Sequence, residues 1–160
     1  MKRKHLKLGT LALFIILCLS VGGAGSFLMG DHVKTWYHTL KMPALTPPDY
    51  IFGPVWTTLY VLMGISIWQI FKCSTKNVKK KKAYILFSIQ LFLNLIWSGL
   101  FFGLQNPQLA LLDNLILWIA IVLTIIEFHK HDELASYLLI PYLVWISFAL
   151  YLNSAFVVIN

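Results

Sequence analysis

The chain is poor in charge and in chemically reactive side chains. Of its 160 residues only 12% are charged, which is about half the share found in soluble domains. All five histidines lie outside the long apolar runs, and the two cysteines, Cys18 and Cys73, fall in an apolar run and a lysine-rich loop. No disulfide, metal cluster, Ser/His/Asp set or Gly-rich phosphate loop is expected from these positions. The shortage of buried polar chemistry argues against hydrolysis, haem ligation from the helices and ion conduction.

Hydrophobic residues make up 59% of the chain, and the mean hydropathy is +0.75. They gather in five apolar runs, at about residues 8–29, 51–71, 83–104, 109–128 and 134–159. Each run has at least the roughly 20 residues that a helix needs to cross a bilayer. The first run begins like a signal peptide but is longer than one, so we interpret it as a membrane span. The sequence therefore predicts an all-α bundle of five transmembrane helices in one integral membrane domain, residues 1–160, with a first outer loop at 30–50.

Lys and Arg alternate between the two ends of these predicted helices. Eleven of the 13 lie before the first run, between the second and third runs, or between the fourth and fifth. Only Lys34 and Lys41 lie on the other side. The positive-inside bias therefore predicts a cytoplasmic N-terminus. The lysine run 79–82 is interpreted as a topology signal and a contact for the lipid bilayer, so no nucleic-acid partner is expected.

Prolines and aromatic residues are concentrated between Trp36 and Tyr60. Proline fixes φ and biases the residue before it to extended geometry, so residues 43–48 should form a stiff arm rather than a helix. Phe52, Trp56 and Tyr60 follow at four-residue spacing and share one helical face. A rigid arm over an aromatic face could cover a flat, apolar ligand. The alternative is a belt of interfacial anchors, since Trp and Tyr collect at membrane surfaces.

The later runs carry polar residues in the middle of apolar sequence. Gln90, Asn94 and Trp97 share one face of the third run, and amides in lipid must face a partner. These side chains either form hydrogen bonds between helices or line a cavity. Asp113 in the fourth run is interpreted as structural, because it lies close to the outer end. Pro141 should bend the fifth run.

Three motifs occur in order along the chain. They are WY-x5-P-x3-PP with F-x3-W-T-x2-Y-x3-G over residues 36–64, QLFLNLIWSGLFF over 90–102, and PYLVWISFALYLN over 141–153. Together they resemble the TspO/MBR family of tryptophan-rich sensory and translocator proteins, and the likeness covers about residues 8–158. The resemblance implies a five-helix bundle in a bacterial cell membrane, usually a homodimer. No Lys or Arg follows Tyr151, so the cholesterol motif of the animal members is not expected.

The resemblance also implies a function. It predicts a pocket under the first outer loop for porphyrins such as protoporphyrin IX, and for isoquinoline-carboxamide and benzodiazepine-type drugs, with no intrinsic cofactor. The leading hypothesis is a sensory or regulatory tetrapyrrole-binding protein. The alternatives are an enzyme that degrades porphyrin in light with Trp56 and Trp145, and a transporter of porphyrin or lipid. Lys34 or Lys41 could hold the carboxylates of a bound porphyrin.

The candidate ligand-binding residues come from the proline arm, the aromatic faces and the three motifs. They are Trp36, Tyr37, Pro47, Pro48, Phe52, Trp56, Tyr60, Gln90, Asn94, Trp97, Trp145 and Ala149.

Overall fold

The computed structural model describes residues 2–73 and 77–160, with only the backbone described for residues 2–7 and 77–79. Every regular element in these ranges is helical. In chain order the elements are α1 (Lys2–Met29), α2 (His32–Thr35), the 3₁₀ turn η1 (Tyr37–Thr39), α3 (Asp49–Lys72), α4 (Asn77–Ser98), the π-helical turn η2 (Gly99–Gly103), α5 (Pro107–His129), α6 (Glu133–Tyr137) and α7 (Ile140–Ile159).

Five stretches are long and apolar enough to cross a membrane: Leu8–Met29, Asp49–Lys72, Lys80–Gly103, Pro107–His129 and Glu133–Ile159. The predicted fold of five transmembrane helices is therefore confirmed. Their outward faces are apolar as well. On α5, for example, Leu112, Ile116 and Ile119 are each about half exposed. A hydrocarbon environment covers such a surface.

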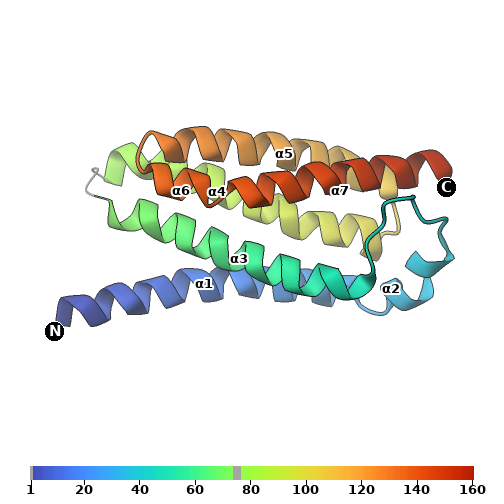
Figure 1. Ribbon diagram of the computed structural model, residues 1–160, viewed down its shortest axis with the longest axis horizontal. Helices are drawn as coiled ribbons and strands as arrows, with labels where there is room; N and C mark the ends of the chain where they lie inside the picture. The colour runs from blue at the N-terminus through green and yellow to red at the C-terminus, as the bar shows by residue number, and fades with distance from the viewer. Residues whose placement is uncertain (1, 74–76) are drawn as a thin grey trace.

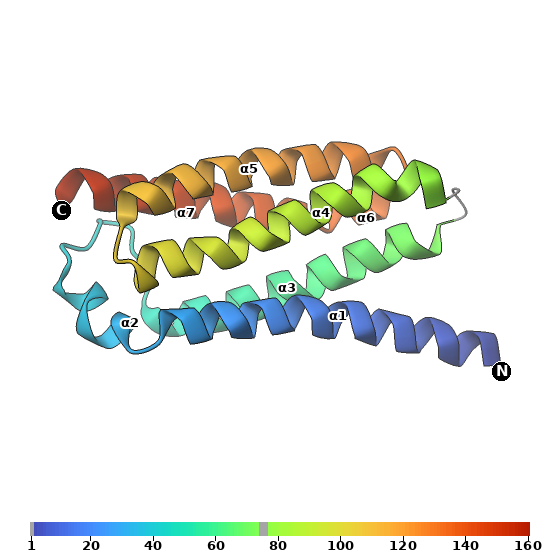
Figure 2. The same cartoon turned by 180° about the vertical axis from the view of Figure 1, so that it is seen from behind.

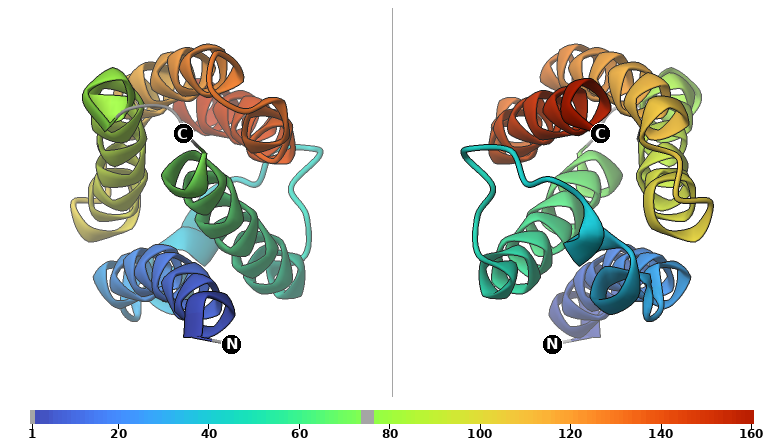
Figure 3. Two further views of the ribbon diagram at one scale, coloured as in Figure 1. Left: turned by 90° about the vertical axis from the view of Figure 1, so that its left-hand side faces the viewer. Right: turned by 90° about the vertical axis from the view of Figure 1, so that its right-hand side faces the viewer.

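The long helices run side by side along the length of the molecule, and the two termini lie at opposite ends (Figure 1). Helix α1 packs along α3, while α4 packs along α5, and α5 along α7 (Figure 2). Viewed from either end, α4, α5 and α7 form one group and α1 and α3 another (Figure 3). The first loop (residues 30–48) closes one end of the bundle across both groups.

Small residues set the distance between α1 and α3. A Cβ atom added at Gly64 would lie 2.6 Å from Cα of Ile15 on α1, so this crossing requires glycine. A Cβ added at Gly22 would overlap the ring of Tyr60. The absence of side chains on these glycines lets α1 lie directly on α3, as small-residue interfaces do in membranes.

Two prolines act differently at the starts of helices. Residues 43–48 are not helical, as predicted, and Pro48 is the N-cap of α3, with Asp49 as the first helical residue. Pro141, which was expected to bend the fifth run, lies next to an interruption in it. The run is divided into α6 and α7, and Pro141 lies in the first turn of α7. Tyr137, four residues before Pro141, is the last residue of α6, as expected where a proline cannot donate a hydrogen bond to that carbonyl.

Lys80 also differs from its predicted role. It is only 2% exposed, and its Nζ donates hydrogen bonds to the carbonyl oxygens of Ile70, Phe71 and Cys73, each at 3.2 Å. These carbonyls end α3 and lack helical partners, and a cation there also suits the helix dipole. One lysine of the run 79–82 therefore caps a helix, and it is not free to contact lipid headgroups. Lys76, another of the charges in this loop, lies outside the described residues.

The orientation of the bundle is tested by cysteine labelling. We expect a membrane-impermeant maleimide to label Lys34→Cys from outside intact cells and Lys81→Cys only after permeabilisation, because of the charge asymmetry. Both lysines are exposed, unlike Lys80. The background carries Cys73→Ser, while Cys18 is fully buried and stays in place. The reverse labelling pattern would show that the N-terminus is outside.

Candidate ligand-binding cavity

A cavity of about 430 Å³ lies between the two groups of helices, near the end covered by the first loop. Its lining comes from α1, α3, α4, α5 and α7, together with Val33 of α2, Tyr37 of η1 and the π-helical turn. This volume is within the range of about 300–1,000 Å³ that small-molecule sites occupy. The cavity is therefore large enough for an organic ligand and is enclosed mainly by helix faces.

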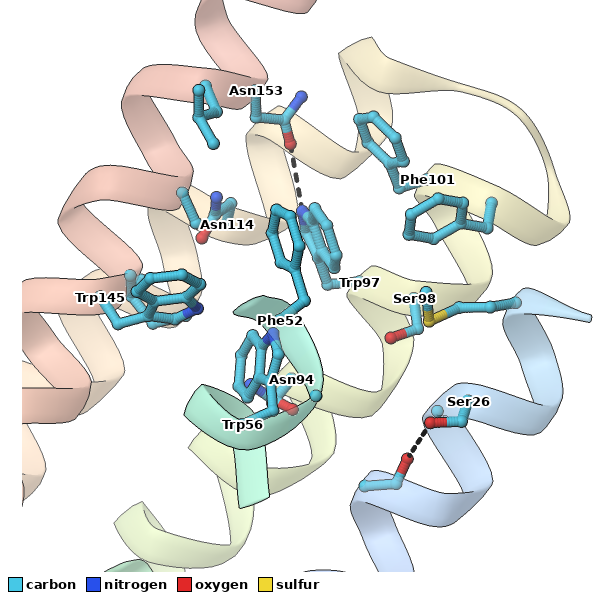
Figure 4. Close-up of a pocket in the computed structure, with 18 of the residues that line it drawn as sticks. Ser26, Phe52, Trp56, Asn94, Trp97, Ser98, Phe101, Asn114, Trp145 and Asn153 are labelled. Carbon is cyan, nitrogen blue, oxygen red and sulfur yellow. Dashed lines mark hydrogen bonds between the residues drawn. The ribbon is translucent and has the colours of Figure 1, made fainter. Parts of the chain in front are cut away.

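Aromatic side chains form much of the cavity wall (Figure 4). Phe52 of α3 meets Trp145 of α7 edge to face, with ring centroids 5.9 Å apart. Trp56 stacks on Tyr60 at 5.6 Å. Among the described residues no hydrogen bond engages the indole N–H of Trp56 or of Trp145, whereas the indole of Trp97 donates one. Two indoles from different helices thus present free donors and flat faces to one space.

Asn94 joins three helices at the inner part of the cavity. Its Oδ1 accepts a hydrogen bond from the Tyr60 hydroxyl at 2.5 Å, and its Nδ2 donates to the Tyr142 hydroxyl at 3.0 Å. Tyr142 is fully buried, and Asn94 is 4% exposed. The prediction that Asn94 faces the interior is confirmed. Of the two alternatives for this residue, it forms hydrogen bonds between helices. Because Tyr60 and Asn94 also line the cavity, both alternatives hold for this residue.

A second amide holds the wall nearer the first loop. Asn153 of α7 accepts a hydrogen bond from the Trp97 indole at 3.1 Å and donates to the Pro107 carbonyl at 2.9 Å. It is 1% exposed. The side chain therefore fixes the plane of the Trp97 ring and ties α7 to the start of α5.

The π-helical turn begins two residues after Trp97. The Leu104 amide donates to the Gly99 carbonyl at 2.8 Å, and Phe101 and Phe102 within the turn are both buried. Tyr37 of the first loop packs against Phe102, with centroids 5.6 Å apart. Turns of this kind are rare in proteins, and those that occur are often found at functional sites. Here the turn provides the aromatic side chains against which the first loop packs.

Further contacts hold the first loop over the cavity. The Lys41 amide donates to the side-chain oxygen of Asn160 at 2.8 Å, and the Asn160 side-chain nitrogen donates to the Lys41 carbonyl at 3.2 Å. His38 Nε2 lies 3.2 Å from Asp49 Oδ2. Burial, and then the nearby Asp49 carboxylate, raises the pKa of Tyr37 to about 12, so its hydroxyl stays protonated at neutral pH.

The structure brings eight of the candidate residues to the cavity: Tyr37, Phe52, Trp56, Tyr60, Asn94, Trp97, Trp145 and Ala149. It does not place Trp36, Pro47, Pro48 or Gln90 in the lining. Trp36 packs on Phe101 at 5.7 Å from the loop side. Pro47 and Pro48 are half-buried and exposed, respectively, in the approach to α3. Gln90 is buried one helical turn beyond Asn94, where its own helix and its neighbours enclose it.

Neither Lys34 nor Lys41 lines the cavity. Both are exposed on the first loop, so a contact of either with a ligand's carboxylates at the outer end stays a prediction. Among the lining residues Asp49 is the only one that is charged at neutral pH. Asp113 is buried on α5, outside the lining.

Sequence reasoning did not find two parts of the lining. Gly22, Gly25 and Ser26 of α1 reach the cavity, and small residues in an apolar run are typical of close helix packing rather than of a site. Asn114 of α5 also reaches it, and its only signal was an amide within an apolar run.

Fold and cavity together define a class: a five-helix integral membrane protein with an aromatic, loop-covered binding cavity between its helices. The TspO/MBR family model matches residues 14–159. The chain belongs to the TspO/MBR family, and it is a multi-pass bacterial membrane protein.

Individual relatives agree with this assignment. The tryptophan-rich protein TspO of Chlorobaculum tepidum is 46% identical over 151 residues, covering 94% of this chain and 96% of the relative. The translocator protein of Homo sapiens is 35% identical over 128 residues, covering 79% and 75%. The tryptophan-rich sensory protein of Cereibacter sphaeroides is 29% identical over 140 residues, covering 88% and 84%.

Replacing Asn94 tests its part in holding the helices. We expect Asn94→Leu to lower the free energy of unfolding by about 1–2 kcal/mol, since it removes two interhelical hydrogen bonds. Gln90→Leu is the matched control one turn away, because the Gln90 amide has no hydrogen-bond partner among the described residues. Thermal unfolding of both variants in the same detergent measures the difference. Equal loss in the two variants would mean that the Asn94 bonds do not stabilise the bundle.

Proposed function

We propose that this protein binds planar tetrapyrroles such as protoporphyrin IX in the cavity, as part of a sensory or regulatory role in tetrapyrrole metabolism. The observation that carries the proposal is the meeting of Trp56, Trp145 and Phe52 in one cavity (Figure 4). A flat, conjugated ligand buries a large apolar face against such rings, and aromatic contacts add about 0.5–1.5 kcal/mol each beyond burial. The name of the Cereibacter sphaeroides relative, a sensory protein, supports the role.

The charge of the lining constrains how a porphyrin would lie. The carboxylate side chains of protoporphyrin IX would stay at the wet end under the first loop, since no cation lines the cavity and ionised acids are costly to bury. Isoquinoline-carboxamide and benzodiazepine-type drugs are smaller flat ligands of the same kind, and we include them in the proposal. We also propose a homodimer, consistent with the apolar outward faces of the helices.

Trp variants test the binding site. We expect Trp56→Phe and Trp145→Phe each to weaken protoporphyrin IX binding roughly three- to tenfold without unfolding the bundle, taking 1.4 kcal/mol as tenfold. Trp118→Phe is the control, since its indole donates to Ser147 Oγ and it does not line the cavity. Visible-absorbance titration measures the affinities. If both cavity variants bind as tightly as Trp118→Phe, the two indoles are not in the site.

A light-dependent porphyrin-degrading enzyme is the second candidate function. It is favoured by the stacking of Trp56 on Tyr60, whose hydroxyl is in turn hydrogen-bonded to Asn94. Both rings are oxidisable, and together they would give a photoexcited ligand an electron donor at the cavity wall. A transporter has less support. Toward the other end the bundle is filled by stacked Phe87 and Phe128 and by fully buried side chains such as Ile70.

Illumination separates the two candidates. If the protein is an enzyme, aerobic illumination of the protoporphyrin complex yields a new absorbing product, and Trp56→Phe or Trp145→Phe loses the product while keeping most of the binding. A binding protein without this activity bleaches the ligand no faster than free ligand in detergent does, and Trp118→Phe should behave like the wild type. Product formation that is unchanged in both cavity variants would rule out the role of these two residues in the reaction.

A further inference from the structure

Helix α5 faces the cavity with only two side chains, Asn114 and Leu117. The amide of Asn114 lies on the wall between Asn153 and Trp145 (Figure 4). Asn114 is 1% exposed, and neither its Nδ2 nor its Oδ1 has a hydrogen-bond partner among the described residues. A buried side-chain amide whose nitrogen and oxygen both lack a hydrogen bond is unusual, and each such group calls for an explanation.

The other two side-chain amides that line the cavity already form hydrogen bonds within the protein. Asn94 uses its oxygen and nitrogen on Tyr60 and Tyr142, and Asn153 uses its own on Trp97 and Pro107. These side chains hold the protein together and have little left to offer a ligand. Asn114 alone among the cavity amides offers both a free donor and a free acceptor.

The amide determines the chemistry of a matching group. A primary amide presents N–H and C=O side by side, so its best partner presents an acceptor next to a donor. The group should be neutral, because no cation lines the cavity and an ionised group would be costly there. A lactam has this arrangement, and so does a carboxylic acid that keeps its proton.

We propose that Asn114 is the polar specificity residue of the cavity and selects ligands whose inserted edge carries a neutral, adjacent donor and acceptor. The inference rests on the proposed function and deepens it: among tetrapyrroles it favours those with a lactam or an un-ionised acid at that edge. The vinyl and methyl edge of protoporphyrin IX would leave the Asn114 amide unpaired.

Four pigments separate the two sources of this chemistry. Biliverdin has lactams and acids, its dimethyl ester has lactams only, protoporphyrin IX has acids only, and its dimethyl ester has neither. Each is titrated against the wild type, Asn114→Leu and the control Leu117→Met, which changes the neighbouring wall position of α5 without touching an amide.

We expect Asn114→Leu to lose about tenfold in affinity, as for a pair of buried hydrogen bonds. If the lactam is the partner, Asn114→Leu weakens the binding of biliverdin and of its dimethyl ester but not the binding of the two porphyrins. If the acid is the partner, Asn114→Leu weakens the binding of the two free acids but not the binding of the two dimethyl esters. Leu117→Met should not discriminate between the pigments. Unchanged affinities, or an equal loss for all four pigments, would overturn the inference and leave the proposed function standing.

Stability distinguishes ligand selection from a structural role. Asn114→Leu removes no hydrogen bond between described residues, so the unliganded variant should unfold at the wild-type temperature or above it. A drop as large as that of Asn94→Leu would show that Asn114 holds the fold, and would overturn the inference. If none of the four pigments binds the wild type, the proposed function itself fails.

Discussion

The arrangement of the helices depends on a hydrogen-bonded chain at the centre of the bundle, from Tyr60 through Asn94 to Tyr142. Hydrocarbon offers polar groups no partner, so these three side chains must satisfy one another. In doing so they fix α3, α4 and α7 at one depth. Asn94 and Tyr60 also line the cavity, so the contact that holds three helices together also forms part of the wall of the site.

The rest of the cavity reflects a balance between large and absent side chains. Gly22 and its neighbours keep α1 thin where Tyr60 lies against it, while indoles and phenyl rings from α3, α4 and α7 surround the open volume. An empty space loses dispersion contacts on its lining. The bundle tolerates this because the aromatic rings contact one another edge to face and stacked, and because Asn153 holds the Trp97 indole in place.

Much of the fold could be predicted, because a bilayer requires about 20 apolar residues per helix and partners for every buried polar group. The same rule correctly placed Asn94 in the interior. Helical spacing shows which residues share a face but not where a cavity ends, so Gln90 shares a face with Asn94 and yet lies outside the lining. A proline can bend a helix or divide it, and only the structure shows that the fifth run is divided into α6 and α7 before Pro141. Asn114 was overlooked because its neighbour Asp113, an acid in an apolar run, is the stronger sequence signal.

The π-helical turn at Gly99–Gly103 has a consequence for sequence change. A five-residue hydrogen-bonded turn contains one residue more than an α-helical turn, so it acts as an insertion within an otherwise regular helix. Deleting one residue there would restore the α-helical repeat and rotate the residues beyond the deletion by about 100° relative to Trp97. Phe102 would then turn away from Tyr37, and the first loop would lose its support although the other membrane spans kept their length. Tolerance to length change at this point is therefore set by rotational register, not by hydrophobicity.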